Sequence, residues 1–298
     1  MIKYRKFLYT ISGMLVLASL ISFIVWGLNP SIDFTGGSLL EVEYIDFEGP
    51  NGEGRPEMSN IKESVGSLGL GEILYQPTGS NGLILRTRDI TEDEHRAILN
   101  VLGEVEQKRF DSIGPVIGKE LTRKAWMAII AVVVIIVLFI AWTFRKVSNP
   151  VSSWKYGLVA IVALIHDVAI PVGIFSVLGH FYNVEVGVLF VTALLTILGF
   201  SVHDTIVVFD RLRENLKKGG REEFDETVDK SLRQVRGRSI KTSLAILLVL
   251  ISLFFFGGVT TQYFTLTLIL GIIFGTYSSL FLASPLLVTW QKFSQKRR

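Results

Sequence analysis

The chain has 298 residues, of which 49% are hydrophobic and 19% are charged, and its mean hydropathy is +0.46. The apolar residues fall in long blocks, which is typical of an integral membrane protein and argues against a soluble globular domain. Cysteine is absent, which excludes disulfides and thiolate metal sites, and a net charge of only +3 does not indicate a nucleic-acid-binding protein.

Six apolar segments are long enough to cross a ~30 Å hydrocarbon core as helices. The first segment follows three basic residues, but it is long for a signal peptide and no small-residue cleavage site follows it. We therefore expect an uncleaved anchor. The predicted spans are residues 7–28, 125–144, 156–178, 184–209, 239–258 and 264–290.

Charge divides the polar segments into two kinds. Residues 29–124 contain 17 acidic and 10 basic residues, whereas residues 211–241 contain 10 basic and 6 acidic ones. Basic residues gather in the cytoplasmic flanks of membrane spans. The pattern therefore predicts a basic cytoplasmic loop at 211–238, two cytoplasmic termini, and residues 29–124 on the opposite side of the membrane.

The polar region 29–124 is predicted to form a small α/β domain. Residues 38–45 largely alternate apolar with polar side chains, as a half-buried strand does. A helix is predicted at 58–68, strands at 72–76 and 83–87, and a last strand at 109–113. Thr91 and Glu94 form a capping box that opens a helix reaching about residue 106. The order β-α-β-β-α-β predicts a ferredoxin-like domain.

Two carboxylates lie inside predicted spans. Asp204 is six residues before the end of the fourth span, about 9 Å below its edge, and Asp167 is about 16 Å into the third span. A charged group at such depth costs about 2.5–3.5 kcal/mol on insertion scales, so it usually marks a partner, a cavity or an ion path. The simpler interpretation is that either residue fixes helix packing by hydrogen bonds, and it carries more weight for Asp167.

Arg238 is the candidate cation for Asp204. The uncharged part of the fifth span is too short to cross the membrane by itself, so the polar residues before it must lie within the membrane boundary. Arg238 is then expected at or just inside the edge of the membrane. Arginine stays charged at physiological pH, so it would be a fixed positive charge beside a carboxylate that exchanges protons. Alternatively, Arg238 is one more positive charge of the cytoplasmic loop. Thr205 and Thr242 are further candidates for a polar relay or for packing.

Other chemistry finds little support in the sequence. His203 and His166 precede the two aspartates, but neighbours in a helix point about 100° apart, so His203 and Asp204 do not face one centre. No zinc-protease, serine-nucleophile or phosphate-loop motif occurs. We expect no metal, no cofactor and no catalytic residue.

A glycine pair follows the first span in the run Asp33, Phe34, Thr35, Gly36 and Gly37. Two glycines permit backbone angles that other residues avoid. The run is therefore either a hinge between the membrane and the polar domain or an ordinary turn.

Five sequence blocks, in the order of the spans, resemble the SecF family. They are DFTGG after the first span, HD in the third, GFSVHDTIVVFDRLREN in the fourth, GRSIKTS before the fifth and GTYSSLFLASPLL in the sixth. The family comprises the smaller six-span subunits of the bacterial SecDF protein-export complex, which belongs to the resistance-nodulation-division superfamily. The resemblance covers the whole chain.

The resemblance implies a function, a location and partners. The chain is expected to lie in the bacterial cytoplasmic membrane and, with SecD, to use the proton-motive force to assist preprotein translocation. The expected partners are SecD, the SecYEG channel, a preprotein in transit and lipid, with SecA, YajC and YidC as further candidates. Protons are the expected coupling ion, and no enzymatic activity is expected.

The resemblance also implies roles for single residues. Asp204 resembles the family's proton-linked aspartate, Arg238 its partner arginine, and residues 33–37 its first signature block. His203 departs from the asparagine expected more often at that position, and it either titrates or simply forms a hydrogen bond. Two other functions compete with proton-coupled export: a scaffold that only holds its partners, and a small-molecule or lipid exporter. The small polar domain argues against the exporter.

Overall fold

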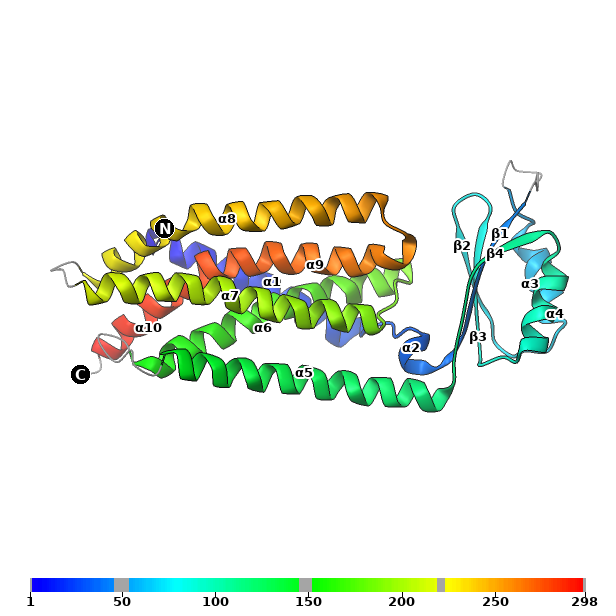
Figure 1. Cartoon of the computed structure of the whole chain (residues 1–298), viewed down its shortest axis with the longest axis horizontal. Helices are drawn as coiled ribbons and strands as arrows, with labels where there is room; N and C mark the ends of the chain where they lie inside the picture. The colour runs from blue at the N-terminus through cyan, green and yellow to red at the C-terminus, as the bar shows by residue number, and fades with distance from the viewer. Residues whose placement is uncertain (1, 46–53, 145–151, 219–222, 297–298) are drawn as a thin grey trace. The chain divides into compact units, whose positions relative to one another are not determined.

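The computed structural model describes residues 2–45, 54–144, 152–218 and 223–296. These residues are mostly helical, with one four-stranded antiparallel sheet (Figure 1). The chain divides into two compact units. One consists of Met1–Asn29 and Met127–Arg298, and the other of Pro30–Trp126.

The first unit is a bundle of long apolar helices. Six segments of the described chain are long and apolar enough to cross a membrane, in agreement with the six predicted spans. Its helices are η1 (Ile2–Tyr4), α1 (Arg5–Trp26), the larger part of α5 (Pro115–Phe144), α6 (Ser153–Tyr182), α7 (Val188–Lys217), α8 (Phe224–Phe256), α9 (Val259–Ser278), the π-helix η2 (Ser279–Ala283) and α10 (Ser284–Lys296). The last three form the sixth candidate span.

The bundle is organised around α6, α7 and the sixth span, which are buried more than the other helices. Figure 1 shows α6, α7, α8 and α9 running lengthwise beside one another, and α7 packs against both α8 and α9. By contrast, α1, α5 and α8 leave large apolar side chains exposed. Such surfaces are expected of helices that face lipid or a partner in the membrane.

Small residues let α1 lie close against α6. The Ser22 hydroxyl donates to the Gly173 carbonyl at 2.9 Å, and the Ser176 hydroxyl donates to the Ser22 carbonyl at 2.9 Å. A Cβ atom on Gly173 would lie only 2.3 Å from the Cβ of Ser19. Close backbone approach with interhelical hydrogen bonds is how helices associate where the hydrophobic effect is absent.

The region predicted as a basic loop, 211–238, is largely helical, which corrects the sequence interpretation. α7 continues to Lys217 and α8 begins at Phe224, while residues 219–222 lie outside the described chain. The cause is a helical apolar stripe that the high charge content conceals: Val228, Leu232 and Val235 are buried against the bundle. The basic side chains occupy the remaining faces of these helix extensions.

The second unit contains the sheet. Its elements are α2 (Ile32–Thr35), β1 (Gly37–Tyr44), α3 (Met58–Gly66), β2 (Leu74–Thr78), β3 (Gly82–Thr87), α4 (Glu92–Leu102) and β4 (Val105–Ile113), followed by the start of α5. From β1 to β4 the order is β-α-β-β-α-β, as predicted. The strand order is β2-β3-β1-β4 and every neighbouring pair is antiparallel.

The two largest boundary differences from the prediction in this unit are the end of α4 and the start of β4. β2 lies two residues later than predicted, α3 ends two residues earlier, and the other strand ends differ by one residue or less. α4 ends at Leu102 because Gly103, at φ +83°, caps it. β4 therefore begins at Val105 instead of residue 109, and a register shift between Glu41 and Val42 of β1 accommodates the longer strand.

The core of this unit lies between the sheet and its two longer helices. Alternate β1 residues Leu40, Val42 and Tyr44 are buried, as the predicted alternation requires. They pack with buried side chains of the other elements, namely Ile61, Val65, Leu83, Leu85 and Ile98.

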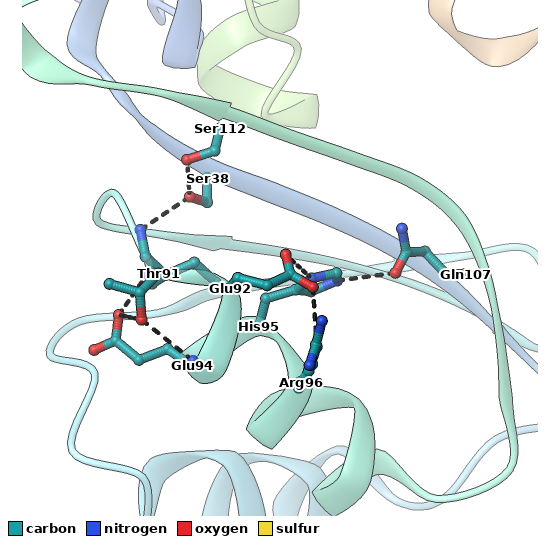
Figure 2. Close-up of polar contacts among 9 residues, drawn as sticks. Ser38, Thr91, Glu92, Glu94, His95, Arg96, Gln107 and Ser112 are labelled. Atoms are coloured by element: carbon teal, nitrogen blue, oxygen red, sulfur yellow. Dashed lines mark hydrogen bonds and ion pairs between the residues drawn. The ribbon is translucent and has the colours of Figure 1, made fainter.

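Polar contacts fasten α4 to the sheet (Figure 2). The buried His95 ring hydrogen bonds through Nε2 to Gln107 of β4 at 2.9 Å and stacks on Phe110, with ring centroids 3.9 Å apart. At the start of α4, the predicted capping box is present between Thr91 and Glu94. Figure 2 also shows Ser38 of β1 bonded to Ser112 of β4, at 2.8 Å.

Replacing Gly173 with alanine should destabilise the bundle. The new Cβ would overlap Ser19, and forcing extra atoms into a packed site costs about 1–3 kcal/mol. The measurement is thermal unfolding of the purified full chain in detergent. Gly199→Ala is the matched control, because a Cβ on Gly199 has no neighbouring atom within 4 Å. Equal stability losses in the two variants would contradict this packing.

Glu94 should stabilise α4 in a pH-dependent way. Its hydrogen bonds to Arg88, and then to the Thr91 backbone N–H, lower its pKa from 4.5 to about 2. A depressed carboxyl pKa contributes stability that is fully present above the unfolded value and is lost as the pH falls from about 4.5 through about 2.

We therefore expect Glu94→Gln to reduce the hydrogen-exchange protection of α4 at neutral pH. The difference from the unchanged chain should vanish as the pH approaches 2. Glu104→Gln, at an exposed position just after α4, is the control. A Glu94→Gln effect of constant size down to that pH would exclude an ionised Glu94 as the cause.

Candidate functional site in the membrane helices

The two His-Asp pairs lie on neighbouring helices of the bundle. On α6, Asp167 and His166 are both buried, with exposed fractions of 0% and 2%. On α7, Asp204 is buried with an exposed fraction of 6%, whereas His203 is exposed. α1, α7 and α9 pack around α6, whereas one side of α7 is exposed. Because neighbouring residues of a helix point about 100° apart, His203 lies on this exposed side while Asp204 is buried.

Asp167 has a complete set of hydrogen-bond donors. His166 Nδ1 lies 2.8 Å from one carboxyl oxygen. The other oxygen accepts from the Ser201 hydroxyl of α7 and, at 2.7 Å, from the Ser278 hydroxyl of α9. Two hydroxyl donors from α7 and α9, together with His166 on the same helix as Asp167, thus replace the water that a buried carboxylate lacks.

Asp204 is held by fewer contacts. One of its oxygens lies 3.5 Å from the Thr276 hydroxyl of α9, a long hydrogen bond, and Thr276 lies 2.6 Å from the Ser243 hydroxyl of α8. If Thr276 donates to Asp204, then Ser243 donates to Thr276. The result is a short chain of hydroxyl groups that leads from α8 to the carboxyl group.

Thr205 joins the same polar region. Its hydroxyl is 2.9 Å from that of Ser279, the first residue of η2, and Ser279 also reaches the Ser201 backbone carbonyl at 3.5 Å. The π-helix begins at this point, and Pro285 follows it. Because a proline ring clashes with the carbonyl of the fourth residue before it, a widened turn here has a local cause.

Arg238 and Thr242 lie on a different side of α8 from the hydroxyl chain. Ser239 and Ser243, four residues apart, are buried against the bundle, while Arg238 and Thr242 are both exposed. In the described part of the chain, no hydrogen bond or ion pair joins Arg238 to Asp204. Thr242 is the predicted candidate for a polar relay on α8. The residue of α8 whose hydroxyl group connects to the Asp204 carboxyl group, through Thr276, is instead its neighbour Ser243.

The glycine run lies within the sheet unit and is tightly packed. Asp33, Phe34 and Thr35 belong to α2, and Gly36 and Gly37 follow at φ +74° and +124°. A Cβ on Gly36 would lie 2.9 Å from the Cα of Pro115, and one on Gly37 would lie 2.6 Å from the Thr87 carbonyl oxygen. Both glycines are needed for this close contact with neighbouring backbone, and a hinge role remains a prediction.

Charged groups gather where α8 begins. Asp225 forms an ion pair with Lys292 of α10, and its carboxylate oxygen lies 3.7 Å from a guanidinium nitrogen of Arg5 of α1. An open cavity of about 940 Å³ adjoins this ion-pair cluster and is lined by both acidic and basic side chains. It is not lined by Asp167 or Asp204, so the polar site of the membrane helices is separate from it.

The sequence did not single out most of the hydroxyl groups that surround the carboxylates. The missed residues are Ser201, Ser243, Thr276, Ser278 and Ser279. Their spacing offered a signal, because Ser201 and Thr205 are one helical turn apart, as are Ser239 and Ser243. Within the described residues, no cluster of His, Asp or Glu is suited to hold a metal ion.

Comparison with known proteins identifies the family. The family described as "Protein export membrane protein SecD/SecF, C-terminal" matches residues 94–293, and the "SecD/SecF GG Motif" matches residues 21–44. The latter range includes the glycine run.

Named relatives match nearly the whole chain. The protein translocase subunit SecF of Thermobaculum terrenum is 38% identical, over 97% of this chain and 93% of its own length. The SecF subunit of Haemophilus influenzae is 34% identical, over 94% of this chain and 82% of its own.

Solved structures agree with these relatives. The crystal structure of SecDF from Thermus thermophilus, a translocon-associated membrane protein, has a TM-score of 0.82 and 29% identity. The match covers 98% of this chain but only 38% of the SecDF chain. Together these matches show that the chain is a multi-pass membrane protein of protein transport, and that it belongs to the SecF family of protein translocase subunits.

Proposed function

We propose that this chain is an accessory subunit of the Sec translocase that, together with SecD, uses the proton-motive force to assist preprotein translocation across the cytoplasmic membrane. The observation that carries the proposal is the buried Asp204 in an apolar span, which has a single long hydrogen bond to the residues that the structure describes. An ionised carboxylate so poorly solvated is costly, and binding a proton removes that cost. Asp204 is therefore suited to take up and release a proton during a conformational cycle.

Arg238 is proposed as the fixed positive charge of that cycle. It lies on α8, the helix whose Ser243 approaches Asp204 through Thr276. Since Arg238 is exposed in this conformation, a pairing with Asp204 requires that α8 rotates or shifts against α7. A second SecDF structure, described as a super-membrane-facing form, matches this chain with a lower TM-score of 0.70. The existence of that form supports a mobile SecDF.

SecD is the proposed partner of the exposed helix faces. The chain spans about two fifths of the SecDF chain that it matches, so the remainder of that chain has no counterpart here. The exposed side of α7 carries Thr192, Thr196, Gly199 and His203. Small and polar residues of this kind are typical of contacts between membrane helices. In this arrangement the side chain of His203 would contact SecD, and the side chain of Asp204 would stay inside the bundle.

The orientation and the remaining partners complete the proposal. The basic flanks favour a cytoplasmic position for the termini and the start of α8, and the ion-pair cluster around Asp225 supports this proposal. The sheet unit would be an extracytoplasmic, ferredoxin-like domain, supported by its element order and its strand order. The SecYEG channel, the preprotein and lipid are proposed contacts, with SecA, YajC and YidC as further candidates and protons as the coupling ion.

The proton role is tested by Asp204→Asn, which keeps the shape of the side chain but cannot ionise. Export of a secreted reporter that depends on the membrane potential should fall to the level of cells lacking the chain. Asp210→Asn, the same change at an exposed position of the same helix, should leave export intact. Copurification of SecD with both variants serves as the control for assembly. Normal potential-dependent export in Asp204→Asn cells would refute proton coupling at this residue and favour a scaffold.

The hydroxyl chain gives a second test. Ser243→Ala should lower the stability of the bundle by about 0.6 kcal/mol and by no more than about 1.7 kcal/mol, the mean and the maximum measured for hydrogen bonds between membrane helices. It should also weaken potential-dependent export, because Thr276 loses a partner beside Asp204. Thr242→Ala, at an exposed site one residue away, should change stability by less than about 0.5 kcal/mol. A larger effect of Thr242→Ala on either unfolding or export would show that α8 presents its other side to Asp204.

A further inference from the structure

A second carboxyl group of the bundle connects three helices. Asp167 of α6 accepts hydrogen bonds from Ser201 of α7 and from Ser278 of α9, and its remaining oxygen faces His166. Asp167 is completely buried. These contacts lie beside the other site, since Ser201 precedes Asp204 by three residues and Ser278 follows Thr276 by two.

The number of donors around Asp167 fits an ionised carboxylate. A carboxylate only accepts hydrogen bonds, and three hydrogens can reach it here. In this state His166 carries its hydrogen on Nδ1, and its other nitrogen, Nε2, is buried without a hydrogen-bond partner among the described residues. That assignment leaves an unpaired acceptor at Nε2. The alternative, a hydrogen on Nε2, would leave an unpaired donor.

Protonation of Asp167 would change this arrangement in a defined way. A protonated carboxyl oxygen must donate its hydrogen, either to His166 Nδ1, with the hydrogen of His166 then on Nε2, or to one of the two serines. In the second case that serine becomes an acceptor and needs another acceptor for its own hydrogen. Ser278 has one, because its hydroxyl also lies 3.1 Å from the Gly275 carbonyl of its own helix. The remaining bonds to Asp167 would be neutral, and charge-assisted hydrogen bonds are about twice as strong as neutral ones.

We propose that Asp167 is a proton-dependent positioning residue that holds α7 and α9 firmly against α6 when ionised and loosely when protonated. Through Ser201 and Ser278 it sets the separation of α7 and α9, and so the distance between Asp204 and Thr276. It also fixes the entrance to η2, which begins directly after Ser278. This inference does not depend on proton-driven export.

The titratable neighbours of Asp167 are few. His166 lies beside it on α6, Asp204 lies on α7 three residues after Ser201, and Tyr277 of α9 stacks on His166 with ring centroids 6.0 Å apart. The other contacts of Asp167 are the neutral serines. In the described chain, no charged side chain of α1, η2 or α10 contacts Asp167.

The test measures the separation of α7 and α9 as a function of pH. The chain has no cysteine, so a pair of spin labels can be attached at Leu189→Cys of α7 and Ile273→Cys of α9, both exposed. Infrared difference spectra of the full chain in membranes report the carbonyl stretch of protonated carboxyl groups. We expect the label separation to increase as the pH falls, together with the appearance of a carboxylic acid band.

Three variants separate the proposal from a merely structural role. Asp167→Asn should remove that band and fix the separation at its low-pH value at every pH. Ser278→Ala should keep the band but reduce the pH-dependent movement, and it carries the test if Asp167→Asn does not fold. Ser176→Ala removes a buried hydroxyl of α6 that bonds to α1 instead, and it should leave the pH profile unchanged.

Two outcomes would overturn the proposal. One is a label separation that does not change with pH in the chain without further substitution. The other is a pH-dependent separation that survives Asp167→Asn, which would assign the movement to another group such as Asp204. Neither readout measures export or proton flow, so the outcome is independent of the experiment on Asp204→Asn.

Discussion

The bundle depends on one constraint: a polar group inside apolar helices must find its partner within the protein, because hydrocarbon offers none. Asp167 meets this constraint with His166 on its own helix and with two serine donors, Ser201 on α7 and Ser278 on α9. The contacts that solvate the carboxyl group are therefore the same contacts that determine how α6, α7 and α9 pack. Asp204, with one long contact, meets the constraint only in part. Hydrogen-bonding partners are thus distributed unevenly between the two carboxyl groups, with more around Asp167 than around Asp204.

The sheet unit obeys different physics, because its helices and strands bury one apolar face each and leave the other polar. Its charged residues act locally: the Arg88–Glu94 pair sits at the first turn of α4, where it also engages the capping box. In the bundle, in contrast, the ion pairs that Asp225 forms with lysine and arginine lie at helix ends, and the buried Asp167 is held by two hydroxyl groups and His166. One chain therefore uses ionic contacts where water is present and neutral donors where it is absent.

Much of this structure could be predicted from the sequence. Span number follows from apolar length, and the β-α-β-β-α-β order follows from alternation and the Thr91–Glu94 capping box. The position of Asp204 inside an apolar helix also followed from the sequence, whereas its depth in the membrane stays a prediction. The hydroxyl partners of Asp167, Ser201 and Ser278, could not be predicted, because they lie 34 and 111 residues away along the chain. Nor could the choice between Thr242 and Ser243, because one residue step is a 100° rotation and the sequence does not give the rotation of a helix about its axis.

The π-helix at Ser279–Ala283 has a consequence for how the chain tolerates length changes. A π turn holds one residue more than the α-helical ladder needs, so the backbone could lose a residue here and remain a continuous helix. The side chains after the deletion would lose their present contacts, because α10 would be rotated by about 100° relative to α9. Trp290, which now meets Trp154 of α6 edge to face, would leave that contact, and Gln291 would leave the buried amine of Lys155. The extra residue thus sets the rotation of α10 relative to α9, so that the sixth span presents Ser278 to Asp167 at one level and Trp290 and Gln291 to α6 at another.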